Sequence, residues 1–340
     1  MAVDTIGSQS AKPQSGEDTG VVALTEKKVE ARSIWVIAVR RYFRHRMAVF
    51  GTILLIMIIL FVTVGALFYT EAEGNATRLR AREVPPGELF TDGRDEDGNE
   101  IITSAILGTD NAGRDILVRL IYGGQISLAI GVTSVTISMT LGTLIGLFAG
   151  YFGGWVDSIL SRITEVFLSI PALILLLVLS SVLTKDTTTV TILGRTLSRT
   201  VVFIVLLIGL TSWMPLSRIV RSQVLSLKEQ EFVMAARAIG VRNLSIILRH
   251  LLPNIVAPVV VAATLGIGTA IITEAYLSFL GFGVQPPTAT WGNIINQARG
   301  QTDTLWWVWM APGAMIVATV LAINFIGDGL RDALDPRSIE

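Results

Sequence analysis

The sequence contains no cysteine and only two histidines, His45 and His250. Without cysteine the chain has no disulfide, no thiolate nucleophile and no thiolate-ligated metal, and two isolated histidines do not make up a metal site. Charge is also scarce. Only 16% of residues are charged, against about 25% in typical soluble domains, and 51% are hydrophobic. This composition excludes an ordinary soluble domain and indicates a membrane protein.

Motifs for nucleotide binding and hydrolysis are missing as well. No GxxxxGK[ST] phosphate loop occurs, so we expect no ATPase site in this chain. The absence of HExxH and GxSxG argues against an intramembrane hydrolase. We therefore predict no catalytic residue, no metal and no cofactor here. The stretch YGGQIS (122–127) resembles the LSGGQ signature of ABC ATPases, but it lies at a predicted membrane boundary and is interpreted as the start of a helix.

Six charge-free runs can each supply the roughly 20 apolar residues that cross about 30 Å of hydrocarbon. A bilayer offers the backbone no water, so these runs must be helices. They are 47–70, 120–156, 166–184, 200–217, 251–273 and 304–327. A seventh run, 275–298, contains Pro286 and Pro287 and is predicted to form short extracytoplasmic helices and turns. The predicted fold is all-α and integral to the membrane, with six transmembrane helices.

The second run carries a glycine at every fourth position, at Gly142, Gly146 and Gly150. Small residues mark places where membrane helices approach closely, so another helix is expected against this face. Gly153 and Gly154 follow, and they predict that the helix ends near Tyr151.

Charge asymmetry predicts the orientation. Arginines cluster just before the first run, whereas residues 71–119 hold eleven acidic and six basic side chains. The positive-inside rule then places both termini, and the basic segment 218–250, in the cytoplasm. The expected parts are a disordered tail at 1–32, an interfacial helix and first span at 33–70, an extracytoplasmic acidic insert leading into span two at 71–122, a core at 123–327, and a cytoplasmic tail at 328–340. A basic tail without structure is the alternative for the interfacial helix.

The cytoplasmic segment between spans four and five has a helical pattern but is too polar to enter the bilayer. Phe232, Ala235, Ala236 and Ile239 share one predicted face. Gly240 favours a helix end, and a second helix from Asn243 is expected to stop before Pro253. This helix pair either docks into a groove on a partner protein or folds back on its own helix ends.

This segment resembles the EAA loop of ABC importer permeases. Ala235, Ala236, Gly240 and Pro253 match the general pattern, and Glu231, His250 and Asn254 match the form EFVxAARAxG…RHxLPN of the oligopeptide/dipeptide branch. Met234 departs from the usual glutamate, and His250 from the usual isoleucine. Three further stretches resemble the C-type permease subunit of that branch: ILGTDNAGRDILVRLIYGGQISLAIG, ITEAYLSFLGFGVQPPTATWG and NFIGDGLRDALDPR. The resemblance covers residues 33–70 and 105–337.

The resemblance implies a type I ABC importer permease fold in the bacterial inner membrane, carrying di- or oligopeptides. It implies a homologous second permease, two ATPase subunits that bind ATP and Mg, an extracytoplasmic substrate-binding protein, and no nucleic acid. Contact with the ATPase would involve the coupling loop 218–254 through Glu231, Phe232, Ala235, Ala236, Gly240, His250 and Pro253. Nickel chelates or oligosaccharides are alternative substrates. An ion-driven secondary transporter is a further alternative, although inverted repeats are not evident.

Several polar residues carry two interpretations each. Glu274, at membrane depth, either lines the substrate pathway or makes an ion pair or a helix-end contact near the water interface. Asp110, Arg114 and Asp115 either form part of the surface that receives the binding protein or are explained by an N-cap at Asp110 and local ion pairs. Glu165 is expected to pair with Arg162, and His250 to make a structural hydrogen bond.

Overall fold

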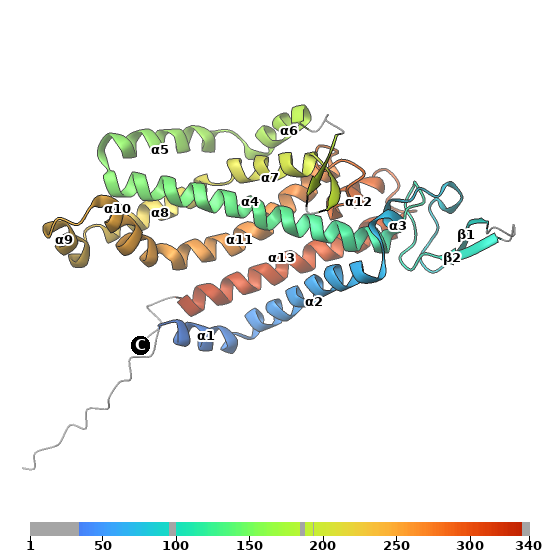
Figure 1. The fold of residues 1–340 in the computed structure, drawn as a ribbon, viewed down its shortest axis with the longest axis horizontal. Coiled ribbons are helices and arrows are strands. Elements are labelled where there is room, and N and C mark those ends of the chain that lie inside the picture. Colours follow the sequence, from blue (N-terminus) through green and yellow to red (C-terminus); the bar gives the residue numbers. More distant parts are fainter. Residues whose placement is uncertain (1–33, 95–99, 184–187, 193, 335–340) are drawn as a thin grey trace, which may run out of the picture.

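The computed structural model describes residues 34–94, 100–183, 188–192 and 194–334, so the predicted tail at 1–32 lies outside the described residues. Its long helices lie side by side along one axis (Figure 1). The longer elements are α1 (Ile34–Arg44), α2 (Arg46–Phe68), α4 (Ile116–Phe152), α5 (Gly154–Ser169), α6 (Ala172–Leu183), α7 (Thr200–Thr211), α8 (Met214–Leu227), α9 (Glu231–Ala238), α11 (Leu252–Phe279) and α13 (Trp306–Leu334). The shorter ones are α3 (Glu71–Asn75), the turn η1 (Leu79–Ala81), α10 (Asn243–Ile246), the π turn η2 (Ile247–Leu251), α12 (Trp291–Gln297), and two antiparallel hairpins, β1–β2 (Leu89–Arg94, Glu100–Ser104) and β3–β4 (Thr189–Ile192, Arg195–Ser198).

Among the residues that the structure describes, five helical segments are long and apolar enough to cross a membrane, and they contain α2, α4, α7 with α8, α10 with α11, and α13. The pair α5 and α6 is apolar enough only when taken together, and it is bent by 82°. Counting that pair once gives the six predicted spans. The predicted third helix, 166–184, is instead two helices, because Pro171 lacks an N–H and disfavours helical backbone at Ile170, whose φ and ψ are −85° and 126°.

The prediction that Pro253 separates the loop from the fifth span is wrong. Residues Asn243–Phe279 form one continuous helical segment, in which η2 joins α10 to α11. Pro253 lies in the first turn of α11, just after the wider π turn has interrupted the regular hydrogen-bond ladder, so its missing N–H is tolerated. Because α8 extends to Leu227, the connecting loop is only 228–242, with α9 inside it.

The long helix α4 is central and packs against α2, α7, α8 and α11. Gly142, Gly146 and Gly150 face α8, which confirms the close helix approach that their spacing predicted. A Cβ atom on Gly146 would lie 2.6 Å from the carbonyl oxygen of Ser217 and 2.7 Å from Val220 Cβ. The helix ends at Phe152, where Gly153 adopts a φ of 64°, so the predicted end near Tyr151 is also confirmed.

We expect Gly146→Ala to lower the free energy of unfolding by about 1–3 kcal/mol, because the added methyl group overpacks the α4–α8 contact. Thermal unfolding of the purified protein in detergent measures this effect. Gly313→Ala in α13 is the matched control, since a Cβ atom there meets nothing within 4 Å. Equal midpoints for the two variants would contradict the close approach.

The two ends of the bundle differ (Figure 1). The acidic insert, with α3 and the β1–β2 hairpin, lies at the same end as α12, which confirms a short helix in the seventh charge-free run. At the opposite end lie α1, α9 and the last turns of α13. The predicted helix before the first span is thus present as α1, and its location in the membrane interface stays a prediction.

Candidate functional site

The turn after α9 is built around Gly240. Its φ is 79°, which confirms the predicted left-handed glycine. The Gly240 N–H donates to the carbonyl of Arg237 (3.0 Å), and the Val241 N–H donates to the carbonyl of Ala236 (3.1 Å). These two bonds form a Schellman cap, which stops the helix and fixes the direction of the chain that leaves it.

One face of α9 belongs to the chain's own core. Val233 is fully buried and Ala236 is 7% exposed. They pack into a hydrophobic cluster formed by the neighbouring ends of α4, α8, α10, η2 and α11, which includes Leu147, Tyr151, Val224, Ile246, Ile247 and Leu251. Ala236 was predicted to share one face with Ala235, but in the structure Ala236 is buried and Ala235 is exposed. Adjacent helical residues differ by about 100°, which is enough to turn Ala236 inward.

The other face of α9 is apolar and uncovered. Phe232 is 42% exposed, Ile239 is 81% exposed, and Ala235 is also exposed. We call these three residues the α9 face. They follow the i, i+3, i+7 spacing of a helix that inserts into a groove. The structure confirms that the helix folds back on the chain's own helix ends through one side. Docking of the other side into a partner stays a prediction.

Polar and aromatic contacts fix α9 to the bundle. The hydroxyl of Tyr151, at the end of α4, donates to Asn243 Oδ1 at 2.8 Å, and Arg237 lies 5.6 Å from the centroid of the Tyr151 ring. His250 faces Phe232, with ring centroids 6.4 Å apart. Within the described chain its side chain has this ring contact and no hydrogen bond, contrary to the prediction. Glu231 lies in the first helical turn, where a carboxylate is favoured by the helix dipole.

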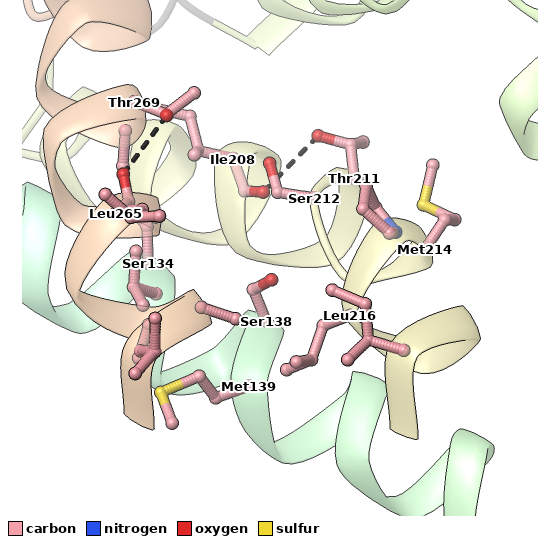
Figure 2. A pocket seen from close by; sticks show the side chains of 18 of the residues that line it. Ser134, Ser138, Met139, Ile208, Thr211, Ser212, Met214, Leu216, Leu265 and Thr269 are labelled. Carbon is pink, nitrogen blue, oxygen red and sulfur yellow. Dashed lines mark hydrogen bonds between the residues drawn. The ribbon is translucent and has the colours of Figure 1, made fainter. Parts of the chain in front are cut away.

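A cavity of about 1150 Å³ opens between α4, the α5–α6 bend, α7, α8 and α11, and it reaches the end of α13. Figure 2 shows hydroxyl-bearing and apolar side chains around it. Among the described residues, Asp328 and Arg331 are the only charged ones in the lining, and both lie at the α13 end. The hydroxyls are those of Ser134, Ser138, Thr211, Ser212, Thr269 and Thr273. This neutral lining can hold a solute without a strong preference for charge.

These hydroxyl residues come from three separate helices and were not predicted from the sequence. Thr269 donates to the carbonyl of Leu265 (3.2 Å) and Thr211 to that of Leu207 (2.6 Å), so both oxygens remain as acceptors. A weak signal was present, since Ser134 and Ser138 are one helical turn apart on α4. Beyond the cavity, towards α12, an apolar cluster fills the space between the helices with Ile126, Ile130, Leu197, Ile204, Leu277 and Val284.

Glu274 is fully buried where α4, α11 and α12 meet. Its carboxylate accepts hydrogen bonds from the hydroxyls of Ser278 (2.7 Å) and Ser127 (3.3 Å), and the Trp291 N–H donates to Ser127 Oγ (3.2 Å). It has no ion pair within the described chain and is not among the residues that line the cavity. Its role in a substrate pathway stays a prediction.

Asp110 and its neighbours form a buried cluster before α4. Asp110 is fully buried and accepts hydrogen bonds from Arg114 Nε (2.8 Å) and from the backbone N–H groups of Ala112 (2.8 Å) and Arg114 (2.9 Å). Arg119 Nε lies 3.9 Å from the same carboxylate. Asp115 caps α4 by accepting from the Val118 N–H (3.1 Å), and burial raises the pKa of its carboxyl. The predicted local ion pairs are thus present, but the helix cap is Asp115 and not Asp110 as predicted, because α4 begins only at Ile116. Contact with a binding protein stays a prediction.

Comparison with known proteins identifies the family. The profile described as "binding-protein-dependent transport system inner membrane component" matches residues 142–340, which are 199 of the 340 residues. The chain belongs to this family. A second profile, the N-terminal transmembrane domain of oligopeptide transport permease C, matches residues 33–86 of this permease. The predicted resemblance is confirmed, and the chain is a multi-pass membrane component of a transport system, not itself an enzyme.

Individual relatives of this permease carry related names. The oligopeptide transport system permease protein OppC of Haemophilus influenzae is 37% identical, over 92% of this chain and 92% of its own length. OppC of Escherichia coli K12 is also 37% identical, over 91% of this chain and 93% of its own. A solved chain of the MetNI methionine ABC transporter, in inward-facing conformations, has a TM-score of 0.49 and 23% identity, over 64% of this chain and 96% of that one.

Proposed function

We propose that this permease forms half of the translocation pathway of an ABC importer for di- and oligopeptides, beside a homologous second permease. The observation that carries the proposal is the cavity of about 1150 Å³ with a neutral lining. Peptides vary in side-chain charge, and a neutral wall repels none of them. Hydroxyl oxygens on the wall accept hydrogen bonds, which backbone N–H groups of any peptide can donate. The names of the OppC relatives point to the same substrate class.

The α9 face is the proposed contact with one of two cytoplasmic ATPase subunits, and these subunits would bind ATP and Mg. Three exposed apolar side chains at the end of the bundle favour a protein partner. On its inner side, α9 is fixed through Val233 and Ala236 to the ends of α4, α8 and α11. Movement of the ATPase would therefore pass directly to helices that line the cavity.

The proposed orientation puts α9 and both termini in the cytoplasm of a bacterial cell. It rests on the basic residues around α1 and between α8 and α11, because basic loops favour the cytoplasmic side. The extracytoplasmic binding protein would then meet the end that carries α3, the β1–β2 hairpin and α12, near Asp110, Arg114 and Asp115. Residues 71–122 would provide this outer surface, and residues 123–327 the pathway and the coupling loop.

Uptake by reconstituted vesicles tests the proposal. The permease is purified with its co-purifying subunits and binding protein, and uptake of a labelled peptide is measured with and without ATP. We expect uptake to require both ATP and the ATPase subunits, and an excess of unlabelled peptide to compete with the label. Uptake driven by an ion gradient in the absence of ATPase subunits would contradict the proposal. Competition by nickel chelates or oligosaccharides, but not by peptides, would change the substrate class.

A further inference from the structure

A second pocket, of about 310 Å³, lies between α4, α5 and α8. It uses the opposite side of α8 from the substrate cavity, and the two share no lining residue. Its polar lining consists of Ser161, Thr164, Glu165, Ser217, Arg218, Arg221 and Ser222. A polar pocket between membrane helices needs a polar occupant, because unpaired polar groups are costly in hydrocarbon.

One cationic side chain of this pocket has no partner within the described chain. Arg221 makes a bidentate pair with Asp157, at 2.5 Å and 2.7 Å, and Arg162 pairs with Glu165 at 3.2 Å. Arg218 is exposed and makes neither an ion pair nor a hydrogen bond within the part of the chain that the structure describes. Its guanidinium therefore supplies unpaired positive charge and free N–H donors at the pocket.

The hydroxyl groups of the pocket are largely engaged as donors. Ser161 donates to Asp157 Oδ1 (3.0 Å), Thr164 to the carbonyl of Leu160 (2.8 Å) and Ser217 to the carbonyl of Met214 (2.8 Å). These hydroxyls carry no charge and do not neutralise Arg218, whereas an anion with acceptor oxygens complements both its charge and its N–H donors.

The depth of Arg218 in the bundle matches the headgroup region of a bilayer. It lies 18 residues after Thr200, where α7 begins, which corresponds to roughly 27 Å along the helix axis. The hydrocarbon core is about 30 Å thick, so a side chain at this position reaches the phosphate level. The apolar part of the pocket lining includes Ile145 of α4 and Leu160 of α5, which provide an apolar surface for acyl chains.

We propose that this pocket binds the phosphate of an anionic phospholipid, with the guanidinium of Arg218 as its main contact. A planar guanidinium matches two phosphate oxygens, and basic pockets between membrane helices suit acidic headgroups. A zwitterionic lipid carries its own ammonium group and leaves less net charge for Arg218. The site therefore discriminates phosphatidylglycerol from phosphatidylcholine.

Native mass spectrometry of the purified complex tests this site by counting retained lipids after addition of phosphatidylglycerol or phosphatidylcholine. We expect at least fivefold more phosphatidylglycerol than phosphatidylcholine on the native protein. Arg218→Gln should remove most of that difference, and so should Ser222→Glu, which places a competing carboxylate at the pocket. Arg249→Gln is the control, because Arg249 is also exposed and unpaired within the described chain and should leave retention unchanged.

Three results would overturn the proposal. One is equal retention of the two lipids by the native protein. Another is an equal loss of phosphatidylglycerol in Arg218→Gln and Arg249→Gln, which would mean a general charge effect. The third is a crosslink from Ser222→Cys to another protein subunit in native membranes, which would mean that a protein covers the pocket.

Discussion

Replacing Ala235 with aspartate is expected to lower ATP-driven peptide uptake at least tenfold while the protein still folds and inserts. Ala235 is exposed at the centre of the α9 face, so a carboxylate there contacts only water in the isolated chain. In the assembled importer the same carboxylate would be buried without a partner in an apolar contact, which is strongly unfavourable. Uptake by reconstituted vesicles, with thermal unfolding measured in parallel, separates the two effects.

Met234→Glu is the matched control for this variant. Met234 is exposed on the same helix but points away from the α9 face, so a carboxylate there stays outside the proposed contact. We expect this control to keep most of the uptake activity. Ala236→Asp is less informative, because Ala236 is buried in the chain's own core and its replacement would destabilise the subunit itself. Normal uptake by Ala235→Asp would exclude the α9 face as a contact.

Asp110→Ala is expected to lower the free energy of unfolding by about 3–5 kcal/mol, which is the usual cost of removing one partner of a buried ion pair. Removing the Asp110 carboxylate leaves Arg119, which is only 2% exposed, without a compensating charge. It also leaves two backbone N–H groups without their hydrogen-bond acceptor. Chemical or thermal unfolding of the purified subunit measures the change. Asp303→Ala, at an exposed position without an ion pair in the described chain, should have little effect.

The double variant Asp110→Ala/Arg119→Leu distinguishes a charge effect from a packing effect. Removing both buried charges should recover part of the lost stability, because the uncompensated guanidinium is gone. The single variant Arg119→Leu completes the comparison. If the double variant loses as much stability as the two single variants together, the charges of Asp110 and Arg119 do not interact.

The number of spans followed from the sequence because hydrocarbon excludes charge, but the limits of the third span did not. The charge-free criterion began that span at Val166, whereas α5 begins at Gly154. The interrupting charges are accommodated by pairing, Asp157 with Arg221 on α8 and Arg162 with Glu165 on α5 itself. A pairing between residues 64 positions apart cannot be read from local composition.

The coupling loop shows a similar division between local and long-range information. Gly240 was predictable, since the end of a helix and a left-handed turn are local properties. The separation of Ala235 from Ala236 was not, because both residues are small and apolar, and only packing against α4, α8 and α11 decides which one is buried. The cavity hydroxyls were missed for the same reason, since Ser138, Ser212 and Thr269 meet only in the folded bundle.

The natural absence of cysteine makes possible a direct test of the contact between the α9 face and the ATPase. A single Ala235→Cys substitution gives a chain with one thiol, which can be crosslinked in native membranes with a short thiol-to-amine reagent. The account predicts one major adduct whose second component, identified by mass spectrometry of its peptides, is a cytoplasmic ATPase subunit. Labelling of this cysteine by a membrane-impermeant reagent from outside intact cells would contradict the account.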